Sequence, residues 1–545
     1  MPHYTRREFL AISSAAVAGM TLPSLGNMAM AASKPRYTRY SVGSKEGKRM
    51  LQSYKKGIRA MLKLPAEDPR NWFRYAFIHF MDCPHGNWWF YVWHRGYIGY
   101  LEQIIRDLSK DKNFALPYWD WTEMPRIPPG MFEDVLTPTN NAFATYTKNL
   151  KLFTDFIKPA LMTYWTTLTD SQLKQQTERG YNTFEDLWNS VIGFDPGSGQ
   201  YLASNLSYTN TCGARYLSKD NPKLDSKTAN AVSAQTVLSG LLPVEFYTDD
   251  ATTSFNSTKT TSHTVQPDSK TFFSILEGQP HNKVHNNIGG VGAIDFGPYG
   301  NMTNFLSPVD PVFFLHHSNM DRLWDIWTRK QQNRQLPYLP TGADETLYMN
   351  ELFQFYVNKS GKHVGTKKAS DYINTRVFDY AYAPGFGEQV IGKPLRLAAK
   401  EKSLTSHHTA NVSKNSATVE IPAQLLKSHT DKKQHKPLVL EIMLPHSAGQ
   451  TVREYDVLVN APADVKRVSA DSPYYGGTIA FFGPRMSGMK MSDTVSFHIA
   501  LPKNLPALVQ ANPGDTLKLE IRVVPAYGDP DHVPELKGVV VKGFK

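Results

Sequence analysis

The chain has 545 residues, 41% of them hydrophobic and 12% aromatic, which is enough for about two to four domains with substantial cores and excludes a disordered or low-complexity protein. Only two cysteines are present, which excludes a disulfide framework and a multi-thiolate metal site. The formal charge is +11, yet no basic run is long or clustered enough to predict a nucleic-acid partner.

The first 32 residues have the pattern of an export signal. Arg6 and Arg7 precede a short apolar run, and the triplet Ala-Met-Ala at 29–31 resembles a small-residue cleavage site. This pattern predicts a twin-arginine signal peptide over residues 1–32, and therefore a periplasmic or extracellular protein. A cytosolic N-terminal helix with two chance arginines is the alternative. The apolar run is shorter than the ~20 residues of a membrane span, and no later segment predicts one.

Residues 33–385 are predicted to form a mainly helical domain. Apolar residues repeat every three or four positions over 97–108 and again over 315–327, as they do on the buried face of a helix. No strand ladder is apparent before residue 385.

A first histidine cluster lies in IHFMDCPHGNWWFYVWHRGY at 78–97, where His79, His85 and His94 have apolar surroundings. Phe90 precedes His94 by four residues, so a helix places both on one face. Neutral imidazole is the commonest side-chain metal ligand, and three together can hold one metal ion and leave room for a further ligand. Three separately satisfied histidines in an aromatic core are the alternative.

A second cluster begins in SILEGQPHNKVHNN at 274–287. His281 and His285 are four residues apart and face the same way on a helix, and Pro280 suits the first turn of that helix. This spacing is a common metal clip, although it also occurs on plain helix surfaces.

The third histidine of the second cluster comes from PVDPVFFLHHSNMDRLW at 308–324. His316 and His317 point about 100° apart on a helix, so only one of them is expected to face a given metal. Phe313 precedes His317 by four residues, which repeats the aromatic spacing of the first cluster. This symmetry favours His317 as the ligand and His316 as a structural or pocket-rim residue.

The pattern changes in the last third of the chain. Residues 386–415 are rich in Lys, Ser, Thr and Gly and predict an exposed linker. Over 416–545, short alternating or β-branched runs such as PLVLEIML, GGTIAFFG and TLKLEIRVVP are separated by Pro, Gly and Asp. They predict a β-sandwich or a small barrel.

The two histidine clusters limit the choice of metal. Neither contains a carboxylate, which disfavours magnesium and calcium and favours copper, zinc, iron or nickel. Two groups of three imidazoles suggest a dinuclear centre that binds a diatomic molecule between its metals.

Three motifs resemble the tyrosinase and polyphenol oxidase family of type-3 copper proteins: WHRGYIGYLEQ from 93, LPYWDW at 116–121 and DPVFFLHHSNMDRLW from 310. The resemblance implies an antiparallel four-helix bundle around two copper ions. It implies His79, His85 and His94 as ligands of the first copper and His281, His285 and His317 as ligands of the second. The family's Tyr-x-Tyr mark near the end of this domain corresponds to residues 380–382.

The resemblance also implies an activity. The family uses O2 as cosubstrate to hydroxylate small monophenols at the ortho position and to oxidise o-diphenols to o-quinones. Glu277 and Asn282 match family positions that hold a water near the copper and are proposed to help deprotonate monophenols. A helix-capping Asn and a surface Glu are the alternative. A homo-oligomer is left open.

Cys83 and the β-rich domain match two further family features. Many members link a cysteine sulfur to the second histidine of the first copper, here Cys83 to His85, although a free buried thiol is the alternative. The C-terminal β-domain resembles a lid that covers the copper entrance. Phe481 or Phe482, in GGTIAFFGPRM at 476–486, is the candidate plug, and two core aromatics in a strand are the alternative.

Four other functions compete with this one. A catechol oxidase or an o-aminophenol oxidase would share the site but lack monophenolase activity. A hemocyanin-like O2 carrier would keep its copper pair shielded, and a dinuclear zinc hydrolase would use the same imidazoles for another metal.

Overall fold

The computed structural model describes residues 34–201, 214–250, 252–265, 270–291, 300–392, 406–409, 411–431, 437–483, 492–503 and 516–543, together with 505 and 508. The predicted twin-arginine signal at 1–32 lies outside these residues. Residues 37–545 form one compact unit, which contains all of the described helices and strands.

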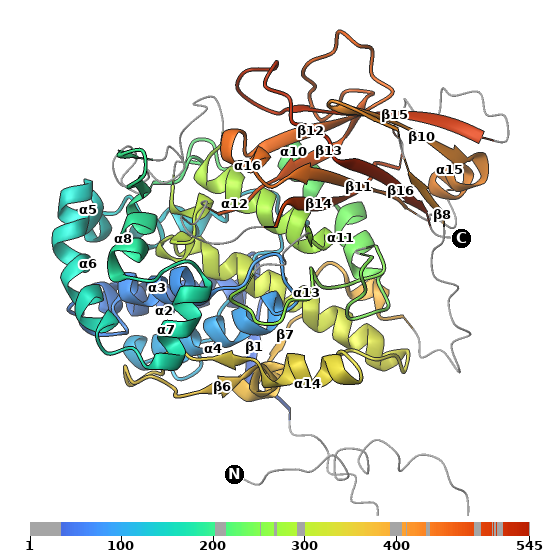
Figure 1. The fold of residues 1–545 in the computed structure, drawn as a ribbon. Coiled ribbons are helices and arrows are strands. Elements are labelled where there is room, and N and C mark those ends of the chain that lie inside the picture. The colour runs from blue at the N-terminus through green and yellow to red at the C-terminus, as the bar shows by residue number, and fades with distance from the viewer. Residues whose placement is uncertain are drawn as a thin grey trace, which may run out of the picture. The chain divides into compact units, whose positions relative to one another are not determined.

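The first part of the unit is helical (Figure 1). Its longer helices are α2 (Lys45–Leu62), α3 (Trp72–Asp82), α4 (Phe90–Ser109), α6 (Leu150–Trp165) and α13 (Val312–Asn333). Shorter ones are α5 (Asn141–Thr147), α7 (Asp170–Glu178), α8 (Phe184–Ile192), α10 (Ser226–Ala231), α11 (Ala234–Leu241), α12 (Asn282–Gly289) and α14 (Ala343–Asn350). Two-stranded pairs join β2 (Phe194–Asp195) to β3 (Gln200–Tyr201) and β5 (Leu352–Phe353) to β6 (Lys367–Lys368).

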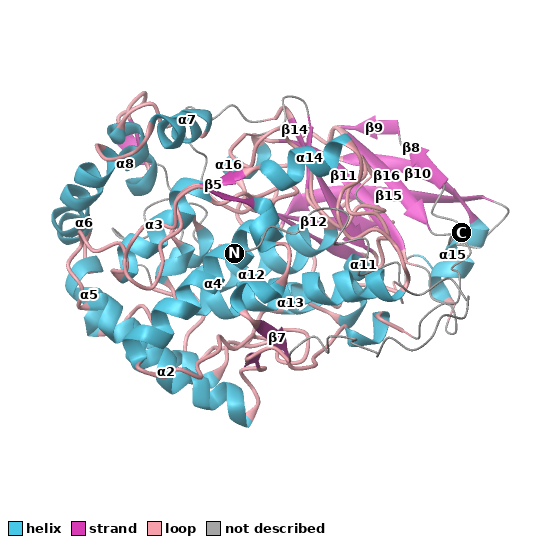
Figure 2. Ribbon diagram, turned by 90° about the horizontal axis from the view of Figure 1, so that it is seen from below, coloured by secondary structure: helices cyan, strands magenta, loops and turns pink. Residues whose placement is uncertain are grey.

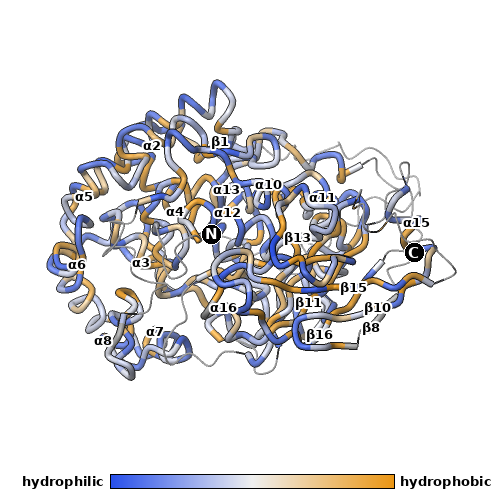
Figure 3. Tube along the Cα trace, turned by 90° about the horizontal axis from the view of Figure 1, so that it is seen from above, coloured by the Kyte–Doolittle hydropathy of each residue, from blue (hydrophilic) through white to orange (hydrophobic). Residues whose placement is uncertain are grey.

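The apolar periodicity is confirmed in two helices. α4 contains the predicted helix at 97–108 and α13 contains the one at 315–327. Both lie in one hydrophobic core that extends from Val42 to Tyr380. Hydrophobic segments, orange in Figure 3, run along inner helices such as α4 and along the C-terminal strands.

The helix that carries His281 starts differently from the prediction. A π-helical turn, Glu277–His281, runs directly into α12 and contains Pro280 in its interior rather than at a helix start. Proline has no N–H to donate and its ring clashes with the carbonyl four residues back, so the extra residue of a π turn relieves the conflict.

Both ends of the helical part are tied to its centre. β1 (Tyr37–Arg39) pairs in parallel with β7 (Tyr380–Tyr382), which is the predicted Tyr-x-Tyr segment. Arg39 donates to the buried Asp321 of α13 at 3.2 Å, and Tyr382 donates to the same carboxylate at 2.6 Å. Removal of one partner from such a buried pair typically costs roughly 3–5 kcal/mol, so this network holds the start and end of the helical part against α13.

The C-terminal part forms two five-stranded sheets, beside the helices in Figure 2. One has the order β13 (Tyr475–Ala480), β12 (Glu454–Val459), β15 (Thr516–Pro525), β10 (Ser416–Pro422), β9 (Asn411–Ser413). The other has the order β4 (Lys270–Phe272), β14 (Thr494–Ala500), β11 (Leu438–Pro445), β16 (Gly538–Gly543), β8 (Ser406–Thr409). Helices α15 (Ala423–Thr430) and α16 (Ala448–Thr451) accompany them. A second core, from Ala417 to Val541, lies between the sheets, so the predicted mainly helical fold with a C-terminal β-sandwich is confirmed.

The two parts are connected through strands as well as side chains. β4, from the helical part, pairs in parallel with β14 of the sandwich, although no strand ladder is apparent there in the sequence. β10 alternates between buried and exposed residues, whereas every residue of β12 and β13 is buried. Burial on both faces shows that the outer side of these two strands packs against the helices.

The segment predicted as a linker differs in part from that expectation. β8 and β9 lie within 386–415, and each pairs with a neighbouring strand of the sandwich. None of the helices in the described ranges is both long and apolar enough to cross a membrane.

Candidate metal centre

The six predicted ligand histidines converge in two groups. His79 lies in the last turn of α3, His85 in the connection to α4, His94 near the start of α4, His281 at the end of the π turn, His285 in α12 and His317 in α13. One potential ligand atom from each of His79, His85 and His94 lies within 4.8 Å of the others, and the same holds for His281, His285, His316 and His317.

The backbone fixes the tautomer of three of these rings. Each directs its Nδ1 at a backbone carbonyl oxygen: His79 at Phe305 (2.7 Å), His94 at Phe90 (2.7 Å) and His285 at Met302 (2.8 Å). Because a carbonyl oxygen only accepts, Nδ1 carries the proton and Nε2 keeps a lone pair. An oxygen in this position commonly orients a metal-binding imidazole.

His281 is fixed in the same way by a side chain. Its Nδ1 lies 2.9 Å from Oδ1 of Asn282, whose Nδ2 donates to the carbonyl of Ala480 at 2.9 Å. Since the amide nitrogen is used as the donor, Oδ1 is the acceptor and His281 also presents a bare Nε2. Burial lowers the pKa of both His79 and His281 to about 3, so both are neutral at pH 7.

His316 and His317 are distinguished by Trp121. The indole Nε1 of Trp121 donates to Nδ1 of His316 at 3.0 Å. Nδ1 of His316 is thus an acceptor, and the proton of this neutral ring is on Nε2, which leaves no lone pair there for a metal. His317, by contrast, has its Nε2 3.3 Å from Nε2 of His285. The Trp121 contact is consistent with His317 rather than His316 as the ligand, and this choice stays a prediction.

The site fits metal ions that prefer imidazole. Nε2 of His79, His94 and His281 is buried and has no hydrogen-bond partner among the described residues, although buried polar atoms nearly always have one. The 3.3 Å between the His285 and His317 nitrogens is close to the separation of two ligands that each lie ~2.0 Å from one tetrahedral metal ion. Copper and zinc both accept such ligand sets.

An aromatic ring packs on one histidine of each group. Phe90 packs on His94 with ring centroids 4.7 Å apart, and Phe313 packs on His317 at 4.1 Å, as their spacing in the sequence predicts. His94 and His317 themselves stack across the groups at 4.2 Å and 11°. The two clusters are thus parts of a single centre.

Phe305 is a functional residue that sequence reasoning missed. Its carbonyl accepts from His79, and its ring stacks on His85 with centroids 5.3 Å apart. It lies in a loop without any periodic signal, and only tertiary packing brings it here. Trp121, in contrast, belongs to the LPYWDW motif, which is a signal available from the sequence.

Glu277 and Asn282 both lie beside His281, and each already has partners. Glu277 accepts from the backbone N–H of Gly86 at 2.7 Å and from the hydroxyl of Ser257. It therefore holds the loop next to His85. Burial raises the pKa of the Glu277 carboxyl to about 8, close to neutral, where a carboxyl can both take up and release a proton.

Cys83 is a buried free thiol next to the first cluster. Its Sγ lies 3.4 Å from Nδ1 of His85. Burial raises the pKa of this thiol to about 12, so the protonated form dominates at neutral pH. Cys212, the other cysteine of the chain, lies outside the described residues.

One residue of the predicted plug segment covers the histidines. The ring of Phe482 lies 4.3 Å from that of His285, 5.0 Å from His85 and 5.4 Å from His281, measured between centroids. Phe481 instead points into the sandwich, where its ring lies 4.9 Å from that of Phe497. The remainder of this loop, residues 484–491, lies outside the described residues.

Polar contacts hold the end of β13 and its neighbouring strand β12 on α12. Asn286 donates to the carbonyl of Phe481 at 2.9 Å, and Lys283 forms a buried ion pair with Glu454 of β12 at 2.6 Å. A second pair, Lys227 with Asp456, joins α10 to the same strand at 2.6 Å. The helical side of the contact is cationic and the sandwich side anionic.

Residues 69–330 match the sequence profile of the tyrosinase family, described as the common central domain of tyrosinase. A chloroplastic polyphenol oxidase of Vitis vinifera is 26% identical over 415 residues, which are 73% of this chain and 55% of the relative. A latent form of chloroplastic polyphenol oxidase from Prunus armeniaca is 22% identical over 439 residues, which are 76% of this chain and 61% of the relative. The alignments thus span little more than half of these relatives.

Solved structures resemble the fold over most of the chain. A latent aurone synthase (polyphenol oxidase) from natural source has a TM-score of 0.53 at 21% identity and covers 94% of this chain and 91% of its own. An oxygen-bound mutant of Aspergillus oryzae pro-tyrosinase has a TM-score of 0.52 at 16% identity, with 93% and 92% covered.

Proposed function

Because this chain belongs to the tyrosinase family of type-3 copper proteins, we propose that it uses O2 to oxidise small phenols at two copper ions. The first ion would be held by His79, His85 and His94 and the second by His281, His285 and His317. The observation that carries the proposal is the pair of imidazole groups, with lone pairs fixed by backbone carbonyls and rings stacked across the two groups.

The chain's own residues would hold, shield and open this centre. A bound copper pair supplies the two-electron reduction of O2 that phenol oxidation needs. The backbone carbonyls keep the imidazole rings oriented, and Phe90 and Phe313, which pack on His94 and His317, would shield the centre from water. The space that Phe482 takes up over His85, His281 and His285 has the size of a phenol ring, and we assign it to the substrate.

Metal analysis of the purified protein tests the proposal. We expect two copper ions per chain, a near-ultraviolet absorption band on addition of hydrogen peroxide, and quinone formation from catechols. Zinc in place of copper would point to a hydrolase. Reversible O2 binding with little quinone, even after the sandwich is detached, would point to a carrier.

We further propose ortho-hydroxylation of monophenols, with Asn282 and Glu277 as the groups that hold the water for deprotonation. In the closed protein the Asn282 amide donates to Ala480 of β13, so departure of this strand would free it for a water. A catechol oxidase or o-aminophenol oxidase would lack this step.

Substitution of Asn282 tests this assignment. Asn282→Gly is expected to lower kcat/KM for monophenols about tenfold or more relative to that for catechols, since a positioned proton acceptor typically contributes 10²–10⁴-fold. Asn282→Asp is the matched control, because it keeps an acceptor for Nδ1 of His281 and should retain catechol turnover. Equal losses on both substrate classes in detergent-opened protein would reject the role.

We propose a thioether between Cys83, whose Sγ lies 3.4 Å from Nδ1 of His85, and a ring carbon of that imidazole. The S–C bond would replace the thiol S–H and a ring C–H bond, and the two electrons and two protons released would reduce O2 at the proposed copper pair. Intact mass spectrometry of copper-loaded protein is expected to show a chain lighter by two hydrogen atoms than its sequence. The deficit should survive reduction, which removes any Cys83–Cys212 disulfide, and should be absent in Cys83→Ser. If the reduced wild-type protein has the mass calculated from its sequence, without the deficit of two hydrogen atoms, the thioether is absent.

We also propose that residues 1–32 direct export by the twin-arginine route. This route carries folded proteins, so it suits an enzyme whose cofactor is inserted before export. The names of the plant relatives place those proteins in chloroplasts. Replacement of Arg6 and Arg7 by lysine should retain the protein in the cytoplasm, as cell fractionation would detect.

A further inference from the structure

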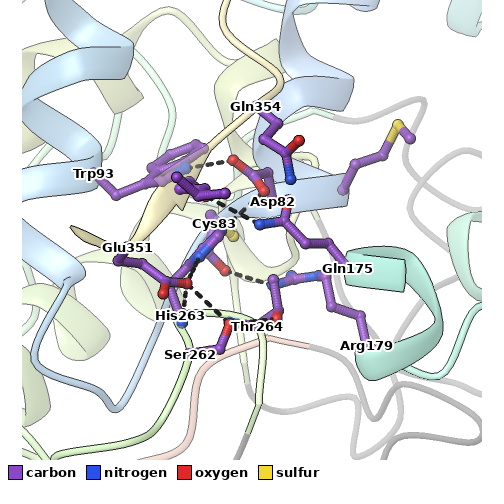
Figure 4. A network of polar contacts seen from close by, with 12 residues as sticks. Asp82, Cys83, Trp93, Gln175, Arg179, Ser262, His263, Thr264, Glu351 and Gln354 are labelled. Atoms are coloured by element: carbon purple, nitrogen blue, oxygen red, sulfur yellow. Dashed lines mark hydrogen bonds and ion pairs between the residues drawn. The ribbon is translucent and has the colours of Figure 1, made fainter. Parts of the chain in front are cut away.

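A network of polar contacts surrounds the C-terminal end of α3 (Figure 4). Its centre is Asp82, the last residue of α3, three residues after His79 and three before His85. The Asp82 carboxylate accepts from Nε1 of Trp93 at 2.7 Å and faces Nε2 of His263 at 2.9 Å. Neither Asp82, Trp93 nor His263 is itself a proposed metal ligand.

His263 is a cation that two carboxylates share. Its Nδ1 lies 2.5 Å from Oε1 of Glu351, while its Nε2 faces Asp82. An ionised carboxylate only accepts, so both ring nitrogens carry a proton. Burial disfavours this charge, but Asp82 and Glu351 outweigh burial and raise the pKa of His263 to about 9.

The opposite side of the same helix end is also held. The last carbonyls of a helix have no partner within the helix, and here donors come from α7 and from Arg179, the residue that follows it. Gln176 donates to the carbonyl of Met81 at 2.9 Å, and Arg179 donates to those of Cys83 at 3.0 Å and Phe80 at 3.4 Å. The end of α3 is thus clamped between α7 and the loop that carries His263.

The clamp reaches the first cluster and not the second. Trp93, held by Asp82, packs on His79 with centroids 5.8 Å apart and on its neighbour His94 at 5.0 Å. The backbone that follows Asp82 leads through Cys83 to His85. Among the contacts of the described residues, none joins His263 or Asp82 to His281, His285 or His317.

We infer that His263 is a positioning residue for the first metal ion: it anchors Asp82, and Asp82 in turn fixes Trp93 and the chain between His79 and His85. This inference rests on the proposed copper function. The physical reason is that Asp82 and Glu351 repel each other in a buried space unless a cation lies between them. Without that cation the helix end shifts, and the ligands of the first cluster lose their alignment while those of the second keep theirs.

Copper release from purified holoprotein tests the inference. His263→Gln is expected to lower the copper affinity of the first cluster about 10- to 100-fold, the usual effect of a lost outer partner. Dialysis against a weak chelator should then leave about one copper ion per chain, where the wild type keeps two. The lone Cu(II) ion should show an electron paramagnetic resonance signal that a coupled pair lacks.

Two variants complete the test. Glu351→Gln keeps the His263–Asp82 contact and should release the first copper to a smaller extent, and it serves if His263→Gln fails to fold. His498→Gln is the matched control, because His498 is a buried histidine 3.6 Å from Glu441 within the sandwich. It should keep both ions.

Three outcomes would overturn the inference: both network variants retain two ions as tightly as the wild type, both lose the two ions together in step with a lower Tm, or His498→Gln loses the first ion equally. A wild-type protein that binds no copper would instead reject the proposed function itself.

Discussion

His317→Ala is expected to abolish phenol oxidation, while His316→Gln keeps most of it. His317 is assigned as a ligand on the 3.3 Å between its Nε2 and that of His285, and alanine leaves the second ion with two ligands. A bound metal contributes several kcal/mol to such a reaction, so kcat should fall at least about 10³-fold.

His316 is the matched control for His317 because the two are adjacent on α13 and both are buried. Trp121 donates to Nδ1 of His316, and glutamine retains an acceptor for that indole. We expect two copper ions per chain in His316→Gln and one in His317→Ala, measured by elemental analysis beside initial rates of quinone formation. The reverse pattern would exchange the roles of the two histidines.

Phe482→Ala is expected to activate the intact chain. The Phe482 ring packs on three of the proposed ligands, where the substrate ring would otherwise lie. Its removal opens that space without loss of the ion pairs that hold the sandwich on α10 and α12. If the ring contributes about 1.4 kcal/mol or more to closure, catechol turnover rises about tenfold or more.

Phe481→Ala distinguishes loss of the ring that covers the histidines from general destabilisation of the sandwich. Phe481 lies in the sandwich core, and truncation of a buried phenylalanine typically costs about 3–5 kcal/mol of unfolding free energy. We expect this variant to have a lower Tm, whereas Phe482→Ala should melt close to the wild type. Rates per bound copper are compared with and without detergent. If detergent activates wild type and Phe482→Ala by the same factor, Phe482 is not the plug.

The ion pairs between β12 and the helices α10 and α12 bear on how the sandwich would separate from the helical part. Lys283 and Glu454 are both buried, and separation of the two parts would expose Lys283 together with Lys227 on the helical side. Buried ion pairs and apolar packing together hold the sandwich on the helical part. Acid, which neutralises Glu454 and Asp456, should therefore separate the two parts, as detergent should.

Sequence alone predicted two of the long helices, the C-terminal sandwich and the ligand candidates. The periodic apolar residues of α4 and α13 predict those helices because side chains three and four positions apart share one face. The same rule places Phe90 on His94 and Phe313 on His317. Alternating runs beyond residue 416 predict the sandwich, since strand side chains alternate between two faces. All of this information lies within one or two turns of a helix or within one strand.

Tertiary structure decided what depends on residues far apart in the chain. Trp121, 195 positions before His316, donates to that ring and not to the adjacent His317, and the backbone after β13 places Phe482 on His285 and Phe481 on Phe497 of the sandwich. Phe305 and His263 have no local signal, because their roles exist only where the carbonyl or the carboxylates meet them. Hydrogen-bond geometry between distant segments follows from packing, and packing is a property of the whole fold rather than of any short stretch of sequence.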